Sequence, residues 1–219
     1  MPVDIVLTQF DLKVDYDGVR QKLKVRPGSK AERRLEDLIA GALAVARPKV
    51  ALKEVRPVLK GDGLVLLEGT IIESQLLERQ LTGQELAFPY LTTGGPELAD
   101  WVAGLSGLDQ YLADELANVI LRQTMAEVEA YLTERYGLAQ VSAMNPGSLP
   151  REWPLSGQVP LFSLMGDLAE QIGIYLKPSL LMVPGKCGSG IFFKTSEKFH
   201  NCQLCHKLEC PARRAPLAM

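Results

Sequence analysis

The longest regular stretch of the chain, residues 108–136, reads LDQYLADELANVILRQTMAEVEAYLTERY. Its apolar side chains recur with the period of an α-helix, so that one face is apolar over roughly seven turns. This face carries Leu112, Leu116, Val119, Ile120, Val128 and Leu132. Gly137 follows, and glycine readily adopts the left-handed conformation that ends a helix. We expect a long helix that forms the spine of the fold, with a hairpin sheet packed against it.

Shorter elements are expected on both sides of this helix. Ser29 and Glu32 have the spacing of a capping box, which predicts a helix that ends before Pro48. Residues 50–59 and 64–67 read as the two strands of a hairpin around Lys60-Gly61-Asp62-Gly63. Further strands are expected at residues 4–10, 69–72, 86–92, 174–177, 180–183 and 190–193, and further helices at residues 74–81, 97–105 and 161–172. Residues 11–28 read as a polar lead-in without regular structure.

All four cysteines of the chain lie in its last 33 residues, in the pattern Cys-x14-Cys-x2-Cys-x4-Cys followed by Pro211. A Cys-x2-Cys step lets two thiolates reach one ion or cluster from a single turn, and iron–sulfur proteins use short steps that a Cys-Pro often closes. Zinc ribbons more often use two separated Cys-x2-Cys pairs. We therefore predict an iron–sulfur cluster, of the four-iron type, with zinc as the alternative. The ligands would be Cys187, Cys202, Cys205 and Cys210.

Two disulfides or four free thiols are the other interpretations of these cysteines. Disulfides are disfavoured because nothing marks the chain as secreted. Between residues 186 and 214 there are six cations and two anions, a balance of 6 − 2 = +4, and nearby positive charge favours the thiolate form. His200 and His206 are the only histidines in the sequence, and either could replace a cysteine as a ligand.

Length and composition restrict the class of protein. The chain has 219 residues, 47% of them hydrophobic and 23% charged, which suits a globular protein with a substantial core. A net charge of −2 argues against nucleic-acid binding. The first ten residues lack the pattern of a signal peptide, and no apolar run reaches the ~18 residues that a membrane span needs. We expect a cytoplasmic protein that does not bind membranes.

Proline dominates the second half of the chain. Eight of the 14 prolines lie between Pro146 and Pro216, and residues 144–160 read as an irregular, largely extended loop. Long loops inside compact domains are usually functional. We expect residues 144–150 to line a concave surface that meets a cofactor or partner, with Trp153 near its rim. Residues 1–185 would form the core, and residues 186–219 a cysteine-rich metal-binding tail of the same domain.

Three motifs carry a resemblance to a known family. They are Asn145-Pro146-Gly147-Ser148-Leu149-Pro150, then Gly173-Ile174-x-Leu176-x-x-Ser179-x-x-Met182-x-Pro184, and then Gly188-Ser189-Gly190. They resemble the activation domain of cobalamin-dependent methionine synthase. The resemblance is closer to stand-alone relatives of that domain, whose tail has the form Cys-x2-Cys-x4-Cys-Pro-x-Arg-Arg-Ala-Pro. Here residues 202–216 match that tail.

The resemblance implies a mixed α+β fold, in which helices flank a curved antiparallel sheet, and a role in corrinoid chemistry. In the synthase this domain docks over cobalamin whose cobalt is in the inactive Co(II) state. It binds S-adenosylmethionine, and one-electron reduction with methyl transfer restores methylcobalamin. The residues that the resemblance assigns to cofactor binding are Asn145, Pro146, Gly147 and Ser148.

This sequence departs from the family at the S-adenosylmethionine motif. The family has an arginine four residues before the glycine of Pro-Gly-Tyr-Pro. Here Ala143 and Ser148 stand in place of the arginine and the tyrosine, and Leu149 is inserted. Loss of the guanidinium and the phenol argues against S-adenosylmethionine binding, unless Ser142 or Arg151 substitutes.

Two functions from different classes follow. The first is a reductive activator of a separate corrinoid protein, short methionine synthase or other cobalamin-dependent methyltransferase. It would take an electron from a low-potential donor and pass it to Co(II) through an iron–sulfur cluster, which can reach the potential required. The second is a non-catalytic docking module for a corrinoid protein, with a structural zinc in its tail. A zinc-knuckle nucleic-acid binder is disfavoured by the charge and the low aromatic content.

Overall fold

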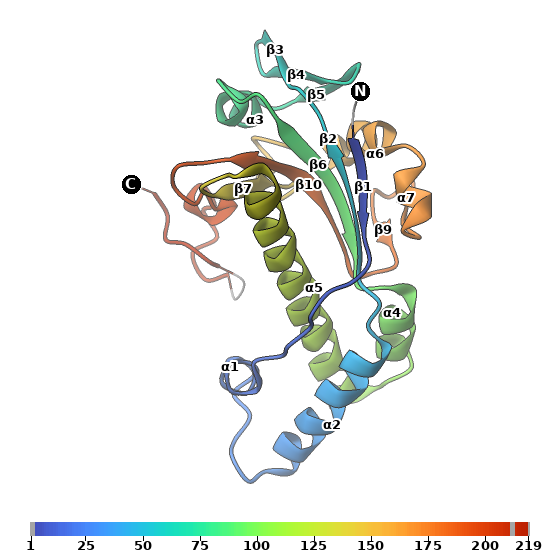
Figure 1. The fold of residues 1–219 in the computed structure, drawn as a ribbon. Helices are drawn as coiled ribbons and strands as arrows, with labels where there is room; N and C mark the ends of the chain where they lie inside the picture. Colours follow the sequence, from blue (N-terminus) through green and yellow to red (C-terminus); the bar gives the residue numbers. More distant parts are fainter. Residues whose placement is uncertain (1–2, 211–212, 219) are drawn as a thin grey trace.

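A five-stranded antiparallel sheet lies at the centre of the chain, of which the computed structural model describes residues 3–210 and 213–218. Its strand order is β1-β2-β6-β10-β7, and Figure 1 shows the sheet curving between layers of helices. The strands are β1 (Val3–Leu7), β2 (Lys49–Glu54), β6 (Ala87–Thr93), β7 (Val141–Met144) and β10 (Cys187–Lys194). The expected α+β architecture is confirmed.

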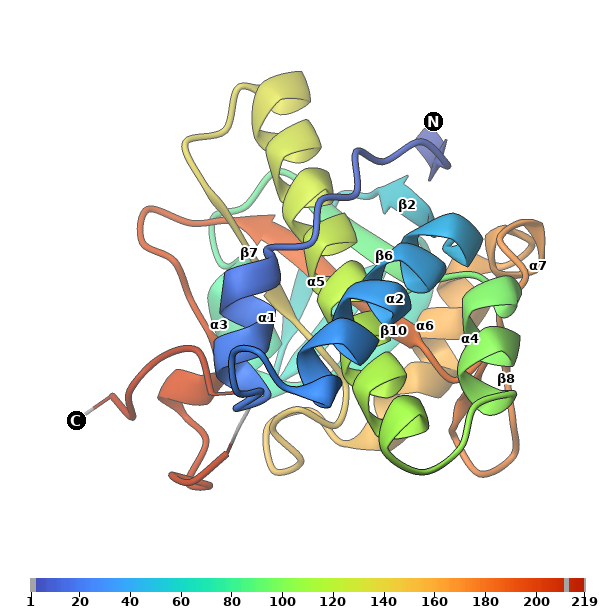
Figure 2. The same cartoon turned by 90° about the horizontal axis from the view of Figure 1, so that it is seen from below.

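The helix α5 (Gly107–Tyr136) covers one face of this sheet (Figure 1). Its C-terminal half packs Val128 and Leu132 against aromatic side chains of β6 and β10. Its N-terminal half extends past the sheet and packs instead against α2 (Lys30–Val45) and α4 (Pro96–Ala103), which Figure 2 shows from below. The helix ends at Gly137 with a φ of 60°, as the sequence predicts.

The opposite face of the sheet is covered by α6 (Gln158–Met165) and α7 (Leu168–Gln171), which the sequence predicts as one helix. Gly166 has a φ of 52°, a left-handed conformation that separates the two. The chain then forms a ribbon of β8 (Tyr175–Leu176) and β9 (Met182–Val183) before it enters β10. Because β10 lies between β6 and β7, residues 187–194 belong to the core sheet and the tail proper begins after Lys194.

The expected hairpin forms, but it does not pack on α5. Residues 50–59 are not one strand: β2 ends at Glu54, and Pro57, which has no N–H to donate to a ladder, separates it from the next strand. The second, three-stranded sheet packs with α3 and α6. It consists of β3 (Val58–Gly61), β4 (Leu64–Leu67) and β5 (Thr70–Glu73), with α3 (Gln75–Leu81) following.

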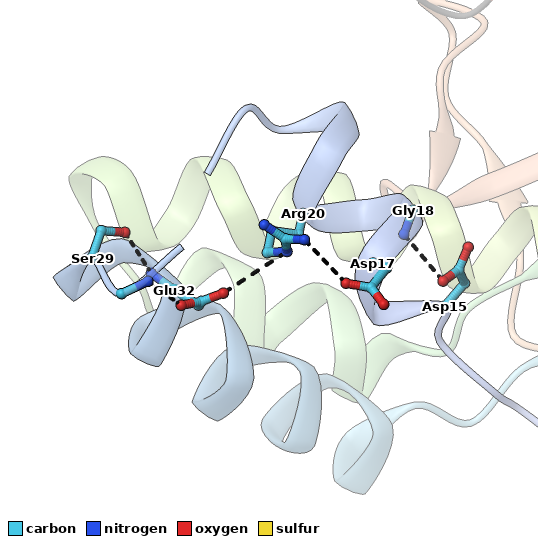
Figure 3. Close-up of polar contacts among 7 residues, drawn as sticks. Asp15, Asp17, Gly18, Arg20, Ser29 and Glu32 are labelled. Atoms are coloured by element: carbon cyan, nitrogen blue, oxygen red, sulfur yellow. Dashed lines mark hydrogen bonds and ion pairs between the residues drawn. The ribbon is translucent and has the colours of Figure 1, made fainter. Parts of the chain in front are cut away.

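The polar lead-in contains a helix that the sequence analysis missed, α1 (Tyr16–Lys22). Figure 3 shows how it is tied to the start of α2: Arg20 lies 3.2 Å from Asp17 and 3.8 Å from Glu32. The hydroxyl of Ser29 accepts a hydrogen bond from the Glu32 N–H at 3.2 Å, so the predicted N-cap is present. In the described residues, no helix has the length and apolar character needed to cross a membrane.

Gly190 of β10 offers a test of the contact between β10 and β7. A methyl group there would lie 2.4 Å from the Met144 carbonyl oxygen and 2.7 Å from Asn145 Nδ2. We expect Gly190→Ala to lower the free energy of unfolding by about 2 kcal/mol, since overpacking costs about 1–3 kcal/mol. Thermal denaturation measures the change. Gly185→Ala is the control, because no atom lies within 4 Å of its Cβ position; equal stability of the two variants would contradict the close contact.

Candidate functional site

A cavity of about 520 Å³ opens where α5, the central sheet and the C-terminal tail meet. Strand alternation turns Thr92 of β6 and Gly188 and Phe192 of β10 toward it. The α5 wall contributes Leu121, Arg122, Met125, Ala126 and Glu129. The remaining lining comes from Tyr90 and from two later segments, Ala143, Asn145 and Ser148, and then Lys198, Phe199, His200, Asn201, Cys202, Cys205, Cys210 and Arg214.

Asn145, at the end of β7, links the sheet to the tail. Its side-chain amide donates to the Tyr90 hydroxyl at 2.6 Å and to the Ser189 carbonyl oxygen at 2.7 Å. The side-chain oxygen of Asn145 accepts a hydrogen bond from the side-chain amide of Asn201 at 3.2 Å. Burial raises the pKa of Tyr90, so this hydroxyl stays protonated at neutral pH. One side chain thus joins β6, β10 and η2 (Asn201–Gln203).

The predicted loop residues divide into two pairs. Asn145 and Ser148 line the cavity, whereas Pro146 is buried elsewhere and Gly147, with a φ of 81°, packs against Leu155. The expectation for Trp153 is wrong: its side chain is 0% exposed and lies in the core under α3 and α6. The loop turns inward where the Trp153 N–H donates to the Leu149 carbonyl oxygen at 2.8 Å, just before the short helix η1 (Leu155–Gly157).

Neither proposed substitute for the missing arginine reaches the cavity. The hydroxyl of Ser142 is 2.9 Å from the Thr195 hydroxyl and accepts from the Phe199 N–H at 2.8 Å. Arg151 lines a second cavity, of about 1090 Å³, which shares Ser148, Phe199 and Cys205 with the first. Two other guanidinium groups, those of Arg122 and Arg214, line the first cavity instead.

The tail is fastened to α5 and β7 before it reaches the cysteines. Lys198 donates to Glu129 at 2.5 Å and to the Val141 carbonyl oxygen at 2.8 Å. This ion pair and the bond from the Phe199 N–H to Ser142 hold the segment after β10 against α5 and the edge strand β7. The tail therefore forms one wall of the cavity.

Arg213 stabilises the tail segment that carries Cys202, Cys205 and Cys210, which is called the cysteine loop below. Its guanidinium group donates to four main-chain carbonyl oxygens, those of Cys202 (2.7 Å), Cys205 (2.6 Å), Lys207 (3.0 Å) and Ala215 (2.9 Å). Such charged hydrogen bonds are stronger than neutral ones. The arginine thereby gives the loop a defined path around the cavity wall. Residues 211 and 212 of the tail motif lie outside the described residues.

The structure brings three of the four cysteines to one cavity. Cys202, Cys205 and Cys210 line it, whereas Cys187 lies on the other face of the sheet, among side chains that pack under α6 and α7. The Cys187 thiol donates to the Pro184 carbonyl oxygen at 2.9 Å, and burial raises its pKa to about 11. Strand alternation is the reason: the neighbour of Cys187, Gly188, is the one that faces the cavity.

A comparison with solved structures finds a match over most of the chain. The crystal structure of the MetH reactivation domain bound to AdoHcy superposes with a TM-score of 0.58. The match covers 91% of this chain and 80% of that one, at 15% sequence identity. The chain has the fold of the MetH reactivation domain. This bears out the fold that the sequence motifs imply. No family model and no curated protein matches the sequence.

A metal centre on this reactivation-domain fold remains a prediction from the sequence. Among the described residues, no group of three or more His, Cys, Asp or Glu side chains is placed so that it could hold a metal ion. Three thiols and His200 line the same cavity, and cysteine and histidine are the residue types that bind zinc and iron–sulfur clusters. His206 faces the second cavity.

Asn145→Ala should destabilise the protein because it leaves the buried Tyr90 hydroxyl and Ser189 carbonyl without their donor. We expect the free energy of unfolding to fall by about 2 kcal/mol, within the usual cost of about 1–3 kcal/mol for a buried unpaired group. Urea denaturation measures it. Asn201→Ala removes only the bond to Asn145 Oδ1 and is expected to cost less than half as much. Equal losses would show that Asn145 does not join the strands.

Cys187 should be distinguishable from the other cysteines by its reactivity. A thiol whose pKa is about 11 instead of 9.0 has roughly 100-fold less thiolate at pH 8, since each pKa unit is tenfold. We expect one slow phase when a thiol reagent labels the native, metal-free protein, and we expect Cys187→Ser to remove that phase. Its rate should rise about tenfold per pH unit between pH 8 and 10. Loss of a fast phase in Cys187→Ser would contradict the burial of this thiol.

Proposed function

We propose that this protein reactivates a corrinoid cofactor carried by another protein. One observation carries the proposal: on the fold of the MetH reactivation domain, three tail cysteines and the loop residues Asn145 and Ser148 line the same cavity. The loop belongs to the motif that resembles the synthase domain, and the cysteines add a redox-capable donor set. Electron delivery and corrinoid docking would then take place on one face of the molecule.

The chemistry required is reduction of Co(II) to Co(I) by one electron, followed by transfer of a methyl cation equivalent to Co(I). A centre held by Cys202, Cys205 and Cys210 would supply the one-electron step if it is an iron–sulfur cluster. A low-potential donor protein would supply the electron. His200 or an exogenous group would complete the ligand set, because Cys187 lies on the opposite face of the sheet.

The corrinoid is expected on a partner protein. The sequence has no Asp-x-His-x-x-Gly motif to supply a lower cobalt ligand, and no Gly-x-Gly-x-x-Gly fingerprint. What it offers is a cavity between a tail and a loop, which suits transient docking over a cofactor held elsewhere. S-adenosylmethionine is the candidate methyl donor, because the similar reactivation domain was solved with AdoHcy.

A second function is a docking module in which the tail is structural. The observation in its favour is Arg213, whose four hydrogen bonds to carbonyl oxygens organise the loop as a rigid element. Zinc would then stabilise the loop without transferring electrons. The two functions differ in the metal that is bound and in whether the cysteines are needed for Co(II) reduction.

Replacement of Cys202 or Cys205 by serine should abolish most of the metal content and the reduction of Co(II). The protein is purified without oxygen, its metal is quantified, and it is mixed with a Co(II) corrinoid protein and a reductant. The Co(II) signal is then followed by electron paramagnetic resonance. Cys187→Ser is the matched control and should keep both the metal and the activity, because this thiol does not line the cavity.

Three outcomes separate the alternatives. Loss of the Co(II) signal with the wild-type protein but not with the Cys202 and Cys205 variants supports the electron relay. Reduction that proceeds equally well with these variants favours the docking module. Unchanged metal stoichiometry in both variants excludes the tail as the metal site.

A further inference from the structure

The outer face of the small sheet formed by β3, β4 and β5 leaves a row of apolar side chains exposed. The register pairs Val58 with Leu66 and Leu66 with Ile71, so these three side chains stand side by side across the sheet. Val58 is 47% exposed and Ile71 is 53% exposed, and Leu66 between them is partly exposed. Figure 1 shows this sheet at the opposite end of the molecule from α2.

The inner face of the same sheet accounts for its folding without this row. Val65, Leu67 and Ile72 alternate with the outer residues and are fully buried in the core with α3 and α6. A strand with one solvated face normally carries polar residues on that face. Here Leu64 and Leu66 of β4 are both apolar on the outer face. Neighbouring exposed apolar side chains of this kind mark an interaction site.

Exposed charges of opposite sign stand on the two outer strands of this sheet. The register pairs Gly61 of β3 with Leu64, and Leu64 with Glu73 of β5. Lys60 lies in a bulge of β3 next to Gly61, where two residues oppose one on the neighbouring strand. Lys60 and Glu73 are both exposed, and within residues 3–210 and 213–218 neither forms an ion pair. The other exposed carboxylate nearby, that of Asp62, belongs to the turn beyond the strands.

This arrangement is complementary to itself. A two-fold axis parallel to the strands would stack two outer faces, with β4 over β4 and β3 of each copy over β5 of the other. Val58 would then pack against Ile71 of the second copy, and Leu66 against its own counterpart. Lys60 would face Glu73 of the second copy, and the symmetry makes this ion pair twice. Apolar and charged groups are thus matched by a single operation.

We infer that the protein forms a two-fold homodimer through the outer face of the small sheet. A second copy supplies both the apolar row and the charges of opposite sign that this face requires. The face is small, so the dimer is expected to be weak and reversible, as is usual when the total buried area is below about 1,200 Å². None of these residues lines either of the two cavities near the tail, so each copy keeps its candidate site accessible.

Analytical ultracentrifugation of the full chain at increasing concentration, from about 1 µM to about 1 mM, should show a shift from monomer to dimer. Ile71→Glu should weaken this association about tenfold or more, because it places two carboxylates between the apolar rows. Leu108→Glu is the matched control and should leave the association unchanged. Leu108 is an apolar residue of similar exposure, 57%, in the first turn of α5, whose N-terminal half packs against α2 and α4.

A charge exchange tests the two-fold arrangement itself. Lys60→Glu alone, or Glu73→Lys alone, replaces two attractions by two repulsions and should weaken the dimer roughly fivefold at low salt. The double variant Lys60→Glu/Glu73→Lys reverses both signs and should restore the affinity of the wild-type protein. These positions are exposed, and circular dichroism with thermal denaturation shows that each variant is folded.

The outcomes are distinct. A dimer that Ile71→Glu weakens, that Leu108→Glu leaves intact and that the double charge variant restores supports the inference. A monomer at every concentration overturns it and leaves the outer face to a different partner or to solvent. A dimer that Ile71→Glu does not weaken also overturns it, because the contact then lies elsewhere. None of these results depends on a metal or on Co(II) reduction, so they leave the proposed function to its own test.

Discussion

The contact between α5 and the aromatic face of the central sheet is the interaction on which the rest of the molecule depends. Phe88, Tyr90 and Phe192 are buried beneath Val128 and Leu132, and the rings of Tyr90 and Phe192 lie 4.6 Å apart. Large side chains of this kind contribute about 1.5–3 kcal/mol each when buried. This contact holds the C-terminal half of α5 on the sheet, and the cavity opens beside it, so that Tyr90 and Phe192 belong to both.

Strand alternation in β10 separates two environments that the sequence places side by side. Gly188 and Phe192 face α5 and the cavity, while Cys187, Ile191 and Phe193 face α6, α7 and the second sheet. A period of two residues leaves no intermediate position. Cys187 directly precedes Gly188, which faces the cavity, yet its own side chain lies on the other face of the sheet. It could join the tail thiols in the cavity only if the strand changed.

The tail acquires its path from contacts with the core. Lys198 is paired with Glu129, Asn201 is bonded to Asn145, and Arg213 closes the loop on its own carbonyl oxygens. Each of these bonds orders a segment that is short of apolar side chains. Polar and charged contacts thus place the cysteines beside the loop residue Asn145.

Local sequence determined the elements whose causes are local. The apolar period and Gly137 define α5, Ser29 caps α2, and Gly61 and Gly63 form the hairpin turn. Only the tertiary structure decided which face each residue occupies. The burial of Trp153 and the separation of Cys187 from the other cysteines both depend on pairings between distant strands and helices. Periodicity gives the spacing of side chains, but the partner that covers each face comes from elsewhere in the chain.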